Sequence, residues 1–192
     1  LADLSDIFAK AEFAVFRTVL GQGGKAKGLA APGCAGYSRS QLAELTDFAR
    51  SRGAKGLVTM ALDGEPGDAL TGLTSDKVRS VVVKYLTIEQ ILEIARRLGA
   101  RRGDLLLIVA DKPKVVDSVM SSLRLEIGRR LGLIDPDLLA FAFVLDFPLF
   151  ERNEEGRWEP MHHPFTSPMP DDVPLLDTNP GRVRARHYDF VC

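Results

Sequence analysis

Residues 104–110 read DLLLIVA, and this stretch decides which fold the neighbouring segments can build. Six of its seven residues are apolar, and the run follows directly after Gly103. A short, uninterrupted apolar run that begins after a turn residue is typical of a strand buried in a sheet. The stretch therefore predicts a buried strand, around which the remaining segments have to pack.

The segments on both sides of this strand have the period of amphipathic helices. Residues 87–99 begin with Thr87 and Gln90 at the spacing of a capping box, and residues 112–132 carry Pro113 in their first turn. The apolar stripes consist of Ile88, Ile91, Leu92, Ala95 and Leu98 in the first helix and of Val116, Met120, Leu123 and Ile127 in the second. Each helix can therefore place one apolar face on a sheet.

Farther toward the N-terminus, the pattern predicts more strands and one more helix. Residues 38–53 form a helix with Ser38 and Gln41 as a capping box, and residues 55–62 form a strand. Residues 12–31 suggest two strands joined by a turn at residues 21–24. Strand pairs mixed with helices predict an α+β fold of two layers, in which helices pack on a mostly antiparallel sheet.

The amino-acid composition of the sequence changes near Asp146. Seven of the eleven prolines fall between Pro148 and Pro180, and all three histidines also lie after Asp146. Here we expect a long strand over 138–150, a hairpin turn over 151–159 and a strand over 182–192. The absence of an initiator methionine and the abrupt end of the last strand lead us to expect an excised piece of a longer protein.

Composition excludes several classes of function. A formal net charge of −1 over 192 residues provides no general basic field that would attract nucleic acid or a membrane surface. The sequence contains no run of about 18 apolar residues, so we expect no membrane span. The two cysteines, Cys34 and Cys192, do not form a disulfide framework, which favours a reducing cytoplasm.

Two short motifs have competing interpretations. The glycine-rich residues 21–28 lack the Ser or Thr after lysine that a phosphate-binding loop requires, so a hairpin turn is favoured there. The arginines near residues 96–102 could contact a phosphate backbone, but cations also favour the C-terminal end of a helix. The first basic cluster consists of Arg96, Arg97, Arg101 and Arg102. A second cluster consists of Arg182, Arg184 and Arg186, which alternate and therefore share one face of the predicted last strand.

Adjacent histidines at 162 and 163 raise the possibility of a zinc site. Neighbouring residues of an extended chain point to opposite faces, so His162 and His163 cannot both bind one ion from a strand. His187 and Asp189 share a face, but no further ligands accompany them, whereas zinc needs three or four. The sequence therefore favours one histidine at a pocket with its neighbour packed behind it, or else a surface pair on a loop.

Longer motifs resemble a known family. Residues 143–168 read FVLDFPLFERNEEGRWEPMHHPFTSP, and residues 184–191 read RARHYDFV. Their order and spacing resemble the late catalytic region of bacterial-type aspartyl-tRNA synthetases, which are class II enzymes. The preceding segments, including 6–16, 53–62 and 121–135, resemble the GAD domain that is inserted in that catalytic domain. The resemblance implies a GAD insertion domain over 8–136 and a partial class II catalytic domain over 137–192.

The resemblance also implies roles for individual residues. The first histidine of the pair, His162, is expected at the L-aspartate pocket, with His163 as a supporting neighbour on the other face. Asp189 is expected near the magnesium that binds with ATP. The parent enzyme would use ATP, magnesium, L-aspartate and tRNA and would form a homodimer. The family's motif 2 arginine and its second magnesium carboxylate have no counterpart here, so no catalytic set is complete and we expect the isolated chain to be inactive and to hold no cofactor.

Two other functions stay open at this stage. The GAD domain also occurs in the B subunit of tRNA-dependent amidotransferases, where it would be a non-catalytic tRNA-binding module. An unrelated α+β binding protein would require the match in the tail to be accidental. If the chain is part of a synthetase, we further expect residues 8–136 to fold on their own. We expect the tail to be the least ordered part, held where Phe147, Leu149 and Phe150 pack on the insertion domain.

Overall fold

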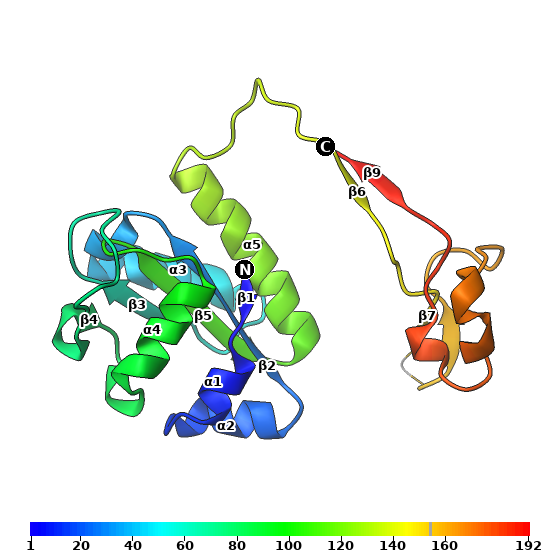
Figure 1. Cartoon of the computed structure of the whole chain (residues 1–192), viewed down its shortest axis with the longest axis horizontal. Helices are drawn as coiled ribbons and strands as arrows, with labels where there is room; N and C mark the ends of the chain where they lie inside the picture. Colours follow the sequence, from blue (N-terminus) through cyan, green and yellow to red (C-terminus); the bar gives the residue numbers. More distant parts are fainter. Residues whose placement is uncertain (154) are drawn as a thin grey trace. The chain divides into compact units, whose positions relative to one another are not determined.

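The computed structural model describes residues 1–153 and 155–192 of the chain. These residues form two compact units, residues 1–134 and residues 135–192, shown in Figure 1. Within the described residues, no helix combines the length and the apolar character that crossing a membrane would require. Each unit has its own sheets and its own core, and the two are described separately below.

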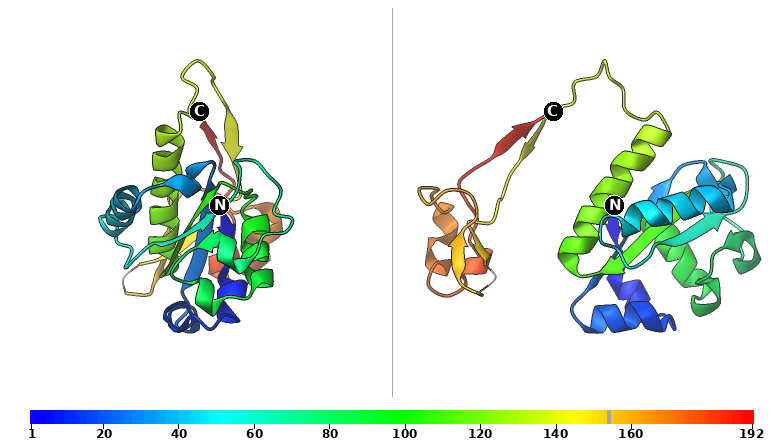
Figure 2. Two further views of the ribbon diagram at one scale, coloured as in Figure 1. Left: turned by 90° about the vertical axis from the view of Figure 1, so that its left-hand side faces the viewer. Right: turned by 180° about the vertical axis from the view of Figure 1, so that it is seen from behind.

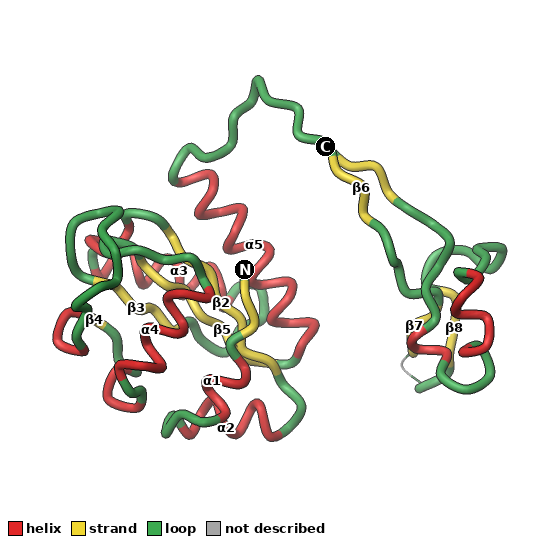
Figure 3. The backbone as a smooth tube through the Cα atoms, in the orientation of Figure 1, coloured by secondary structure: helices red, strands yellow, loops and turns green. Residues whose placement is uncertain are grey.

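Unit 1, residues 1–134, is built on a five-stranded sheet with the order β1-β2-β5-β3-β4 (Figure 3). The strands are β1 (Ala2–Asp3), β2 (Lys25–Ala31), β3 (Val58–Leu62), β4 (Val78–Arg79) and β5 (Leu105–Asp111). Every pairing in this sheet is antiparallel, and Leu107 of β5 lies opposite Leu29 of β2 and Thr59 of β3. The stretch DLLLIVA is therefore the central strand, which confirms the buried strand predicted from sequence.

Helices cover both faces of this sheet. On one face, α1 (Ser5–Ala9), α2 (Ala14–Gly21) and α4 (Ile88–Arg97) pack over Leu106 and Ile108 of β5. On the other face, α3 (Arg39–Arg50) and α5 (Pro113–Arg130) pack over Leu105, Leu107 and Val109. Figure 2 shows α5 in a further view.

The α+β class and the antiparallel sheet are thus confirmed, but the unit has three layers rather than the two predicted. The reason lies in β5, whose side chains alternate between the two faces of the sheet. Leu105 to Val109 are all at most 1% exposed. Because neither side of β5 carries polar residues to face water, both sides have to be covered by helices.

Local signals in the sequence fix the helix ends. Ser38 and Gln41 form a complete capping box at the start of α3, and Thr87 and Gln90 form another at the start of α4. In α5, Pro113 occupies the first turn, where the missing N–H costs no hydrogen bond. All three helices begin within one residue and end within three residues of the predicted ranges, because these signals suit the unpaired N–H groups at a helix start.

Residues 12–31 differ from the prediction of two strands. Residues 14–21 form helix α2, and only residues 25–31 form a strand. Phe13, Phe16 and Leu20 are spaced by three and four residues, which is the period of a helix, and they pack in the core. Gly24 follows at the turn, where an added Cβ would lie 2.7 Å from the carbonyl oxygen of Val19.

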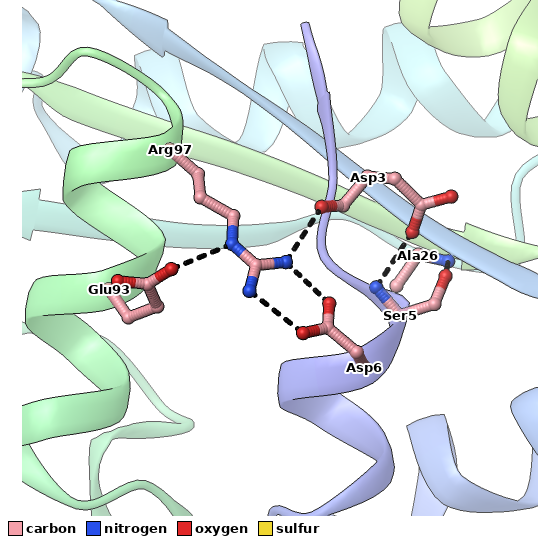
Figure 4. Close-up of polar contacts among 6 residues, drawn as sticks. All are labelled: Asp3, Ser5, Asp6, Ala26, Glu93 and Arg97. Carbon is pink, nitrogen blue, oxygen red and sulfur yellow. Dashed lines mark hydrogen bonds and ion pairs between the residues drawn. The ribbon is translucent and has the colours of Figure 1, made fainter.

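A cluster around Arg97 links α1 and α4 on one face of unit 1 (Figure 4). The guanidinium of Arg97 donates to both carboxylate oxygens of Asp6 in α1, at 2.5 and 2.8 Å, and to Glu93 within α4 at 2.9 Å. These hydrogen bonds from Arg97 lower the pKa of the Asp6 carboxyl. At the first residue of α1, the hydroxyl of Ser5 accepts the N–H of Ala26 at 3.0 Å and fixes α1 to β2.

Unit 2, residues 135–192, contains two small antiparallel sheets. Strand β6 (Ala142–Val144) pairs with β9 (Asp189–Val191), and β7 (Phe150–Arg152) pairs with β8 (Trp158–Pro160). The hairpin predicted over 151–159 is confirmed in its described residues, and the side-chain oxygen of Asn153 accepts the N–H groups of Glu155 and Arg157 in the turn. Two short 3₁₀ helices, η4 (Pro170–Leu175) and η5 (Pro180–Arg182), follow.

Three expectations for the tail are wrong. Residues 138–150 do not form one strand, because the chain turns between β6 and β7, where Asp146 has a φ of 58°. The last strand is limited to residues 189–191, and it has a partner in β6. Phe147, Leu149 and Phe150 pack within unit 2, on a small core formed by Leu149, Val183 and Ala185.

Candidate functional site

An extended segment, residues 183–187, joins the parts of unit 2 that carry the candidate residues. On one side, the N–H of Leu149 donates to the carbonyl of Val183 at 2.8 Å, and the N–H of Ala185 donates to the carbonyl of Phe147. On the other side, Met169 and Arg186 exchange backbone hydrogen bonds with Arg184 and Ser167, each at 2.8 Å. These pairings bring the DFPLF, HHPFTSP and RHYDF motifs together.

His162 lies in a cluster of three rings. Its imidazole is perpendicular to the ring of Phe147, with centroids 5.0 Å apart, and lies against the imidazole of His187, with centroids 4.4 Å apart. The ring of Phe147 also contacts His187, at 4.5 Å. The side chain of His162 is otherwise exposed, so part of its imidazole is open to a ligand.

His163 has different neighbours. Its ring lies 5.1 Å from the ring of Phe165, and its Nδ1 accepts the N–H of Phe165 at 3.2 Å. The two adjacent histidines therefore do not converge on one point, as expected for consecutive residues of an extended chain. Their segment is nevertheless a series of bends and turns rather than a strand.

Asp189 is the first residue of β9, and its carboxylate is exposed. The Oδ1 atom of Asp189 lies 3.6 Å from Nε2 of His187. His187 thus contacts His162 with its ring and approaches Asp189 with its nitrogen. Two of the sequence-predicted residues, His162 and Asp189, are therefore neighbours of the same side chain, whereas His163 lies apart from it.

Next to this site lies an ion-pair cluster that the sequence does not predict. Arg184 donates to both carboxylate oxygens of Asp172, at 2.8 and 3.0 Å, and lies 3.3 Å from the carboxylate of Asp146. The hydrogen bonds from Arg184 lower the pKa of the Asp172 carboxyl. The alternation of arginines in residues 182–186 indicates an extended segment, but it does not identify Asp172, which lies twelve residues earlier in η4.

The basic residues of unit 1 have mainly structural partners. Arg97 is held by Asp6 and Glu93, as described above, and Arg101 and Arg102 donate to the carbonyl oxygens of Gly67 and Thr71. The glycine-rich residues 21–28 connect a helix to a strand, whereas a phosphate-binding loop connects a strand to a helix. Neither motif therefore adds a phosphate site to the candidate residues in unit 2.

Asp189 offers one oxygen donor of the kind that magnesium prefers. A carboxylate oxygen is a hard ligand, and Mg²⁺ in nucleotide enzymes is bound by one or two carboxylates together with substrate phosphates. Asp189 is exposed and could supply one such oxygen. Among residues 1–153 and 155–192, no group of three or more His, Cys, Asp or Glu side chains could hold a metal ion by itself.

Comparison with known proteins assigns the family. The sequence model of the GAD domain matches residues 16–120, which is more than half of the chain and lies within unit 1. The chain belongs to the GAD domain family. The matched GAD segment contains four strands of the five-stranded sheet, β2 to β5, together with α3, α4 and most of α2.

Relatives match the GAD segment and the tail together. An aspartate–tRNA(Asp/Asn) ligase of Dehalococcoides mccartyi is 51% identical over 193 residues, and those of Moorella thermoacetica and Geotalea uraniireducens are 46% and 44% identical over 192 residues. All of the present chain is covered in each case. The chain spans only about a third of the length of these relatives, 30–32%. The resemblance to aspartyl-tRNA synthetases seen in the sequence is thereby confirmed.

Proposed function

We propose that this chain is part of an enzyme that activates L-aspartate with ATP and transfers it to tRNA. The observation that carries the proposal is the match of the whole chain, at 44–51% identity, to three aspartate–tRNA(Asp/Asn) ligases. The names of these relatives further support a substrate range that includes both the aspartate and the asparagine tRNA. The enzyme would work in the cytoplasm as a homodimer.

His162 would bind L-aspartate. Its imidazole is exposed on one side and supported by rings on the other, so an N–H of the ring can reach a ligand carboxylate. A hydrogen bond from an imidazole to a carboxylate is charge-assisted and stronger than a neutral one. His163 would support this segment through its hydrogen bond with the N–H of Phe165 rather than contact the substrate.

Asp189 would lie near the magnesium that accompanies ATP. When bound, magnesium would neutralise charge on the phosphates during attack of the aspartate carboxylate on the α-phosphate. The carboxylate of Asp189 can contribute one oxygen to this arrangement, because it is exposed. Its distance of 3.6 Å from Nε2 of His187 is too long for a hydrogen bond. Its role would be to hold the cation through one carboxylate oxygen.

The 192 residues alone would not catalyse this reaction. They span about a third of the relatives, and the candidate side chains His162 and Asp189 lie on an open surface rather than in an enclosed pocket. Enclosure matters because a site shielded from water strengthens every electrostatic contact with the substrate. The predicted GAD domain, residues 8–136, would act as a structural or tRNA-adjacent module.

The alternative, a GAD module in the B subunit of a tRNA-dependent amidotransferase, has less support. Residues 135–192 lie outside the GAD match but inside the match to the ligases. An amidotransferase would have no use for an aspartate pocket at His162. A longer gene product that forms no aspartyl-adenylate but binds tRNA would favour this alternative.

The test is ATP–pyrophosphate exchange by the longer protein that contains this chain. Exchange should depend on L-aspartate and be absent with glutamate, asparagine or lysine. His162→Ala should lower kcat/KM for aspartate by about tenfold to a hundredfold, as expected for the loss of one hydrogen bond to a charged group. His163→Ala is the matched control, and it should lower thermal stability more than the affinity for aspartate.

Two results would overturn the proposal. Unchanged aspartate kinetics in His162→Ala would leave the histidine pair as a surface feature of a loop. Pyrophosphate exchange above background with the purified 192-residue chain would contradict the proposed dependence on the rest of the enzyme.

A further inference from the structure

The ring cluster around His162 is assembled from three separate segments. Phe147 precedes β7, His162 follows β8, and His187 precedes β9. All three pairs of rings are in contact, with centroid distances of 4.4, 4.5 and 5.0 Å. The planes of the two imidazoles are inclined by 31°, so the ring of His187 packs against the ring of His162 in a tilted contact.

The members of this cluster are held to different degrees. His187 is partly buried, and the two preceding residues, Ala185 and Arg186, both donate backbone hydrogen bonds to neighbouring segments. His162 is exposed and lies in a bend, and its two neighbours, Met161 and His163, form backbone hydrogen bonds with Leu149 and Thr166. An exposed imidazole can occupy several rotamers, so the fixed ring of His187 restricts the more mobile one.

No hydrogen bond from Nε2 accounts for the position of the His187 ring among the residues that the structure describes. Nε2 of His187 is buried and has no hydrogen-bond partner among the residues that the structure describes. Its nearest acidic neighbour, Asp189 Oδ1, is 3.6 Å away, which is too far for a hydrogen bond. What His187 offers to His162 is therefore the face of a flat ring, which another aromatic side chain could also provide.

We propose that His187 is a positioning residue that holds the His162 imidazole, through ring contact, in the orientation that binds L-aspartate. The proposal rests on the function proposed above for His162. His187 itself touches neither the substrate nor the reacting atoms. Its effect is to preorganise a binding group, and preorganisation improves affinity because less rotamer entropy is lost when the ligand binds.

The test compares His187→Phe with His187→Ala in the longer protein, in ATP–pyrophosphate exchange. His187→Ala should raise the KM for aspartate about twofold to tenfold, the range that corresponds to one aromatic pair contact, with little change in kcat or in the KM for ATP. His187→Phe keeps the ring and should restore the KM for aspartate to within about twofold of the original value. Equal losses in both variants, or no loss in His187→Ala, would overturn the proposal.

Two additional measurements keep the outcomes separable. If His162→Ala has no effect on aspartate kinetics, the proposed function fails, whereas an effect of His162→Ala without an effect of His187→Ala rejects only the positioning role. In the 192-residue chain, the NMR signals of the His162 ring protons should move toward free-histidine positions in His187→Ala but stay dispersed in His187→Phe. Unchanged His162 signals in His187→Ala would contradict the ring contact even if the longer variant did not fold.

Discussion

The two units bury apolar residues to very different extents. In unit 1, every residue from Leu105 to Val109 of the central strand is at most 1% exposed, and helices cover the sheet on both faces. In unit 2, the core consists of Leu149, Val183 and Ala185, while Phe143 and Phe190 of the β6–β9 pair are 61% and 59% exposed. Unit 1 therefore has the burial that a stable domain needs, and unit 2 has little of it.

This difference separates stability from chemistry within one chain. Hydrophobic burial, the dominant favourable contribution to folding, is concentrated in the GAD unit, whereas His162, His163 and Asp189 lie in unit 2 with exposed side chains. Candidate binding groups have to remain accessible, so they cannot contribute to a core. The predictions below test the contrast, beginning with the largest expected effect.

The N-terminal residues should contribute strongly to unit 1. Leu4 is fully buried and Ile7 is 6% exposed, and both belong to the core on the α4 side of the sheet. The sequence resemblance predicts that the folding domain begins at residue 8. A chain of residues 8–136 should be less stable than a chain of residues 1–134 by about 4 kcal/mol or more, because two buried aliphatic side chains are lost.

Urea denaturation followed by circular dichroism would measure this difference. The 1–134 chain should unfold in one cooperative transition, and the 8–136 chain should show a much lower midpoint or no transition. Equal midpoints would mean that Leu4 and Ile7 contribute little to the core.

A single substitution at the centre of the sheet should affect unit 1 but not unit 2. Leu107→Ala in β5 leaves a cavity between the sheet and α5 and should cost about 2–5 kcal/mol. The matched substitution is Leu149→Ala, in the small core of unit 2. In urea denaturation of the 192-residue chain, Leu107→Ala should shift the main transition to lower urea, and Leu149→Ala should leave it in place. A main transition that responds more strongly to Leu149→Ala would reverse the comparison.

A smaller, pH-dependent contribution comes from Glu126 in α5. Its carboxylate accepts hydrogen bonds from Arg129 at 2.6 Å and Arg130 at 2.7 Å, and the hydrogen bonds from Arg130 and Arg129 lower its pKa. A pKa that is lower in the folded state stabilises the protein above the ordinary pKa of glutamate, about 4.3, and this stabilisation is lost as the pH falls through the folded-state pKa.

Glu126→Gln should therefore lower the free energy of unfolding by on the order of 1 kcal/mol at pH 7, and by less as the pH falls from about 4 toward 2. The control is Asp47→Asn, because the pair formed by Asp47 and Arg50 is exposed and 3.7 Å apart. Chemical denaturation at several pH values would measure both variants. A loss in Glu126→Gln that is the same at pH 3 and pH 7 would show that packing rather than charge is responsible.

Much of unit 1 could be predicted from the sequence because its signals are local. The capping boxes at Ser38 and Thr87 and the apolar run in β5 specify their elements without reference to the rest of the chain. Residues 14–21 were mistaken for a strand because a short apolar segment fits both periods. The two-layer prediction is wrong because the apolar run of β5 predicts a buried strand but does not itself specify that helices cover both of its faces.

The site was less predictable because its contacts are distant in sequence. The motifs identified His162 and Asp189, but the ring contact between His162 and His187 spans 25 residues. The ion pair of Arg184 with Asp172 depends on η4, a proline-rich 3₁₀ helix whose sequence has no apolar periodicity that would predict it. The pairing of β9 with β6 does not follow from the sequence, because the apolar residues 138–150 predict one strand and give no signal for the turn at Asp146.

Residue-resolved hydrogen exchange of the 192-residue chain tests the central claim, that stability is concentrated in unit 1. Amides of β5 should exchange most slowly and only through global unfolding, because this strand is paired on both sides and buried. Amides of residues 142–144 and 189–191 should exchange many times faster, because an isolated two-stranded pair is marginal in water. Protection of residues 183–191 equal to that of β5, lost at the same urea concentration, would contradict the account.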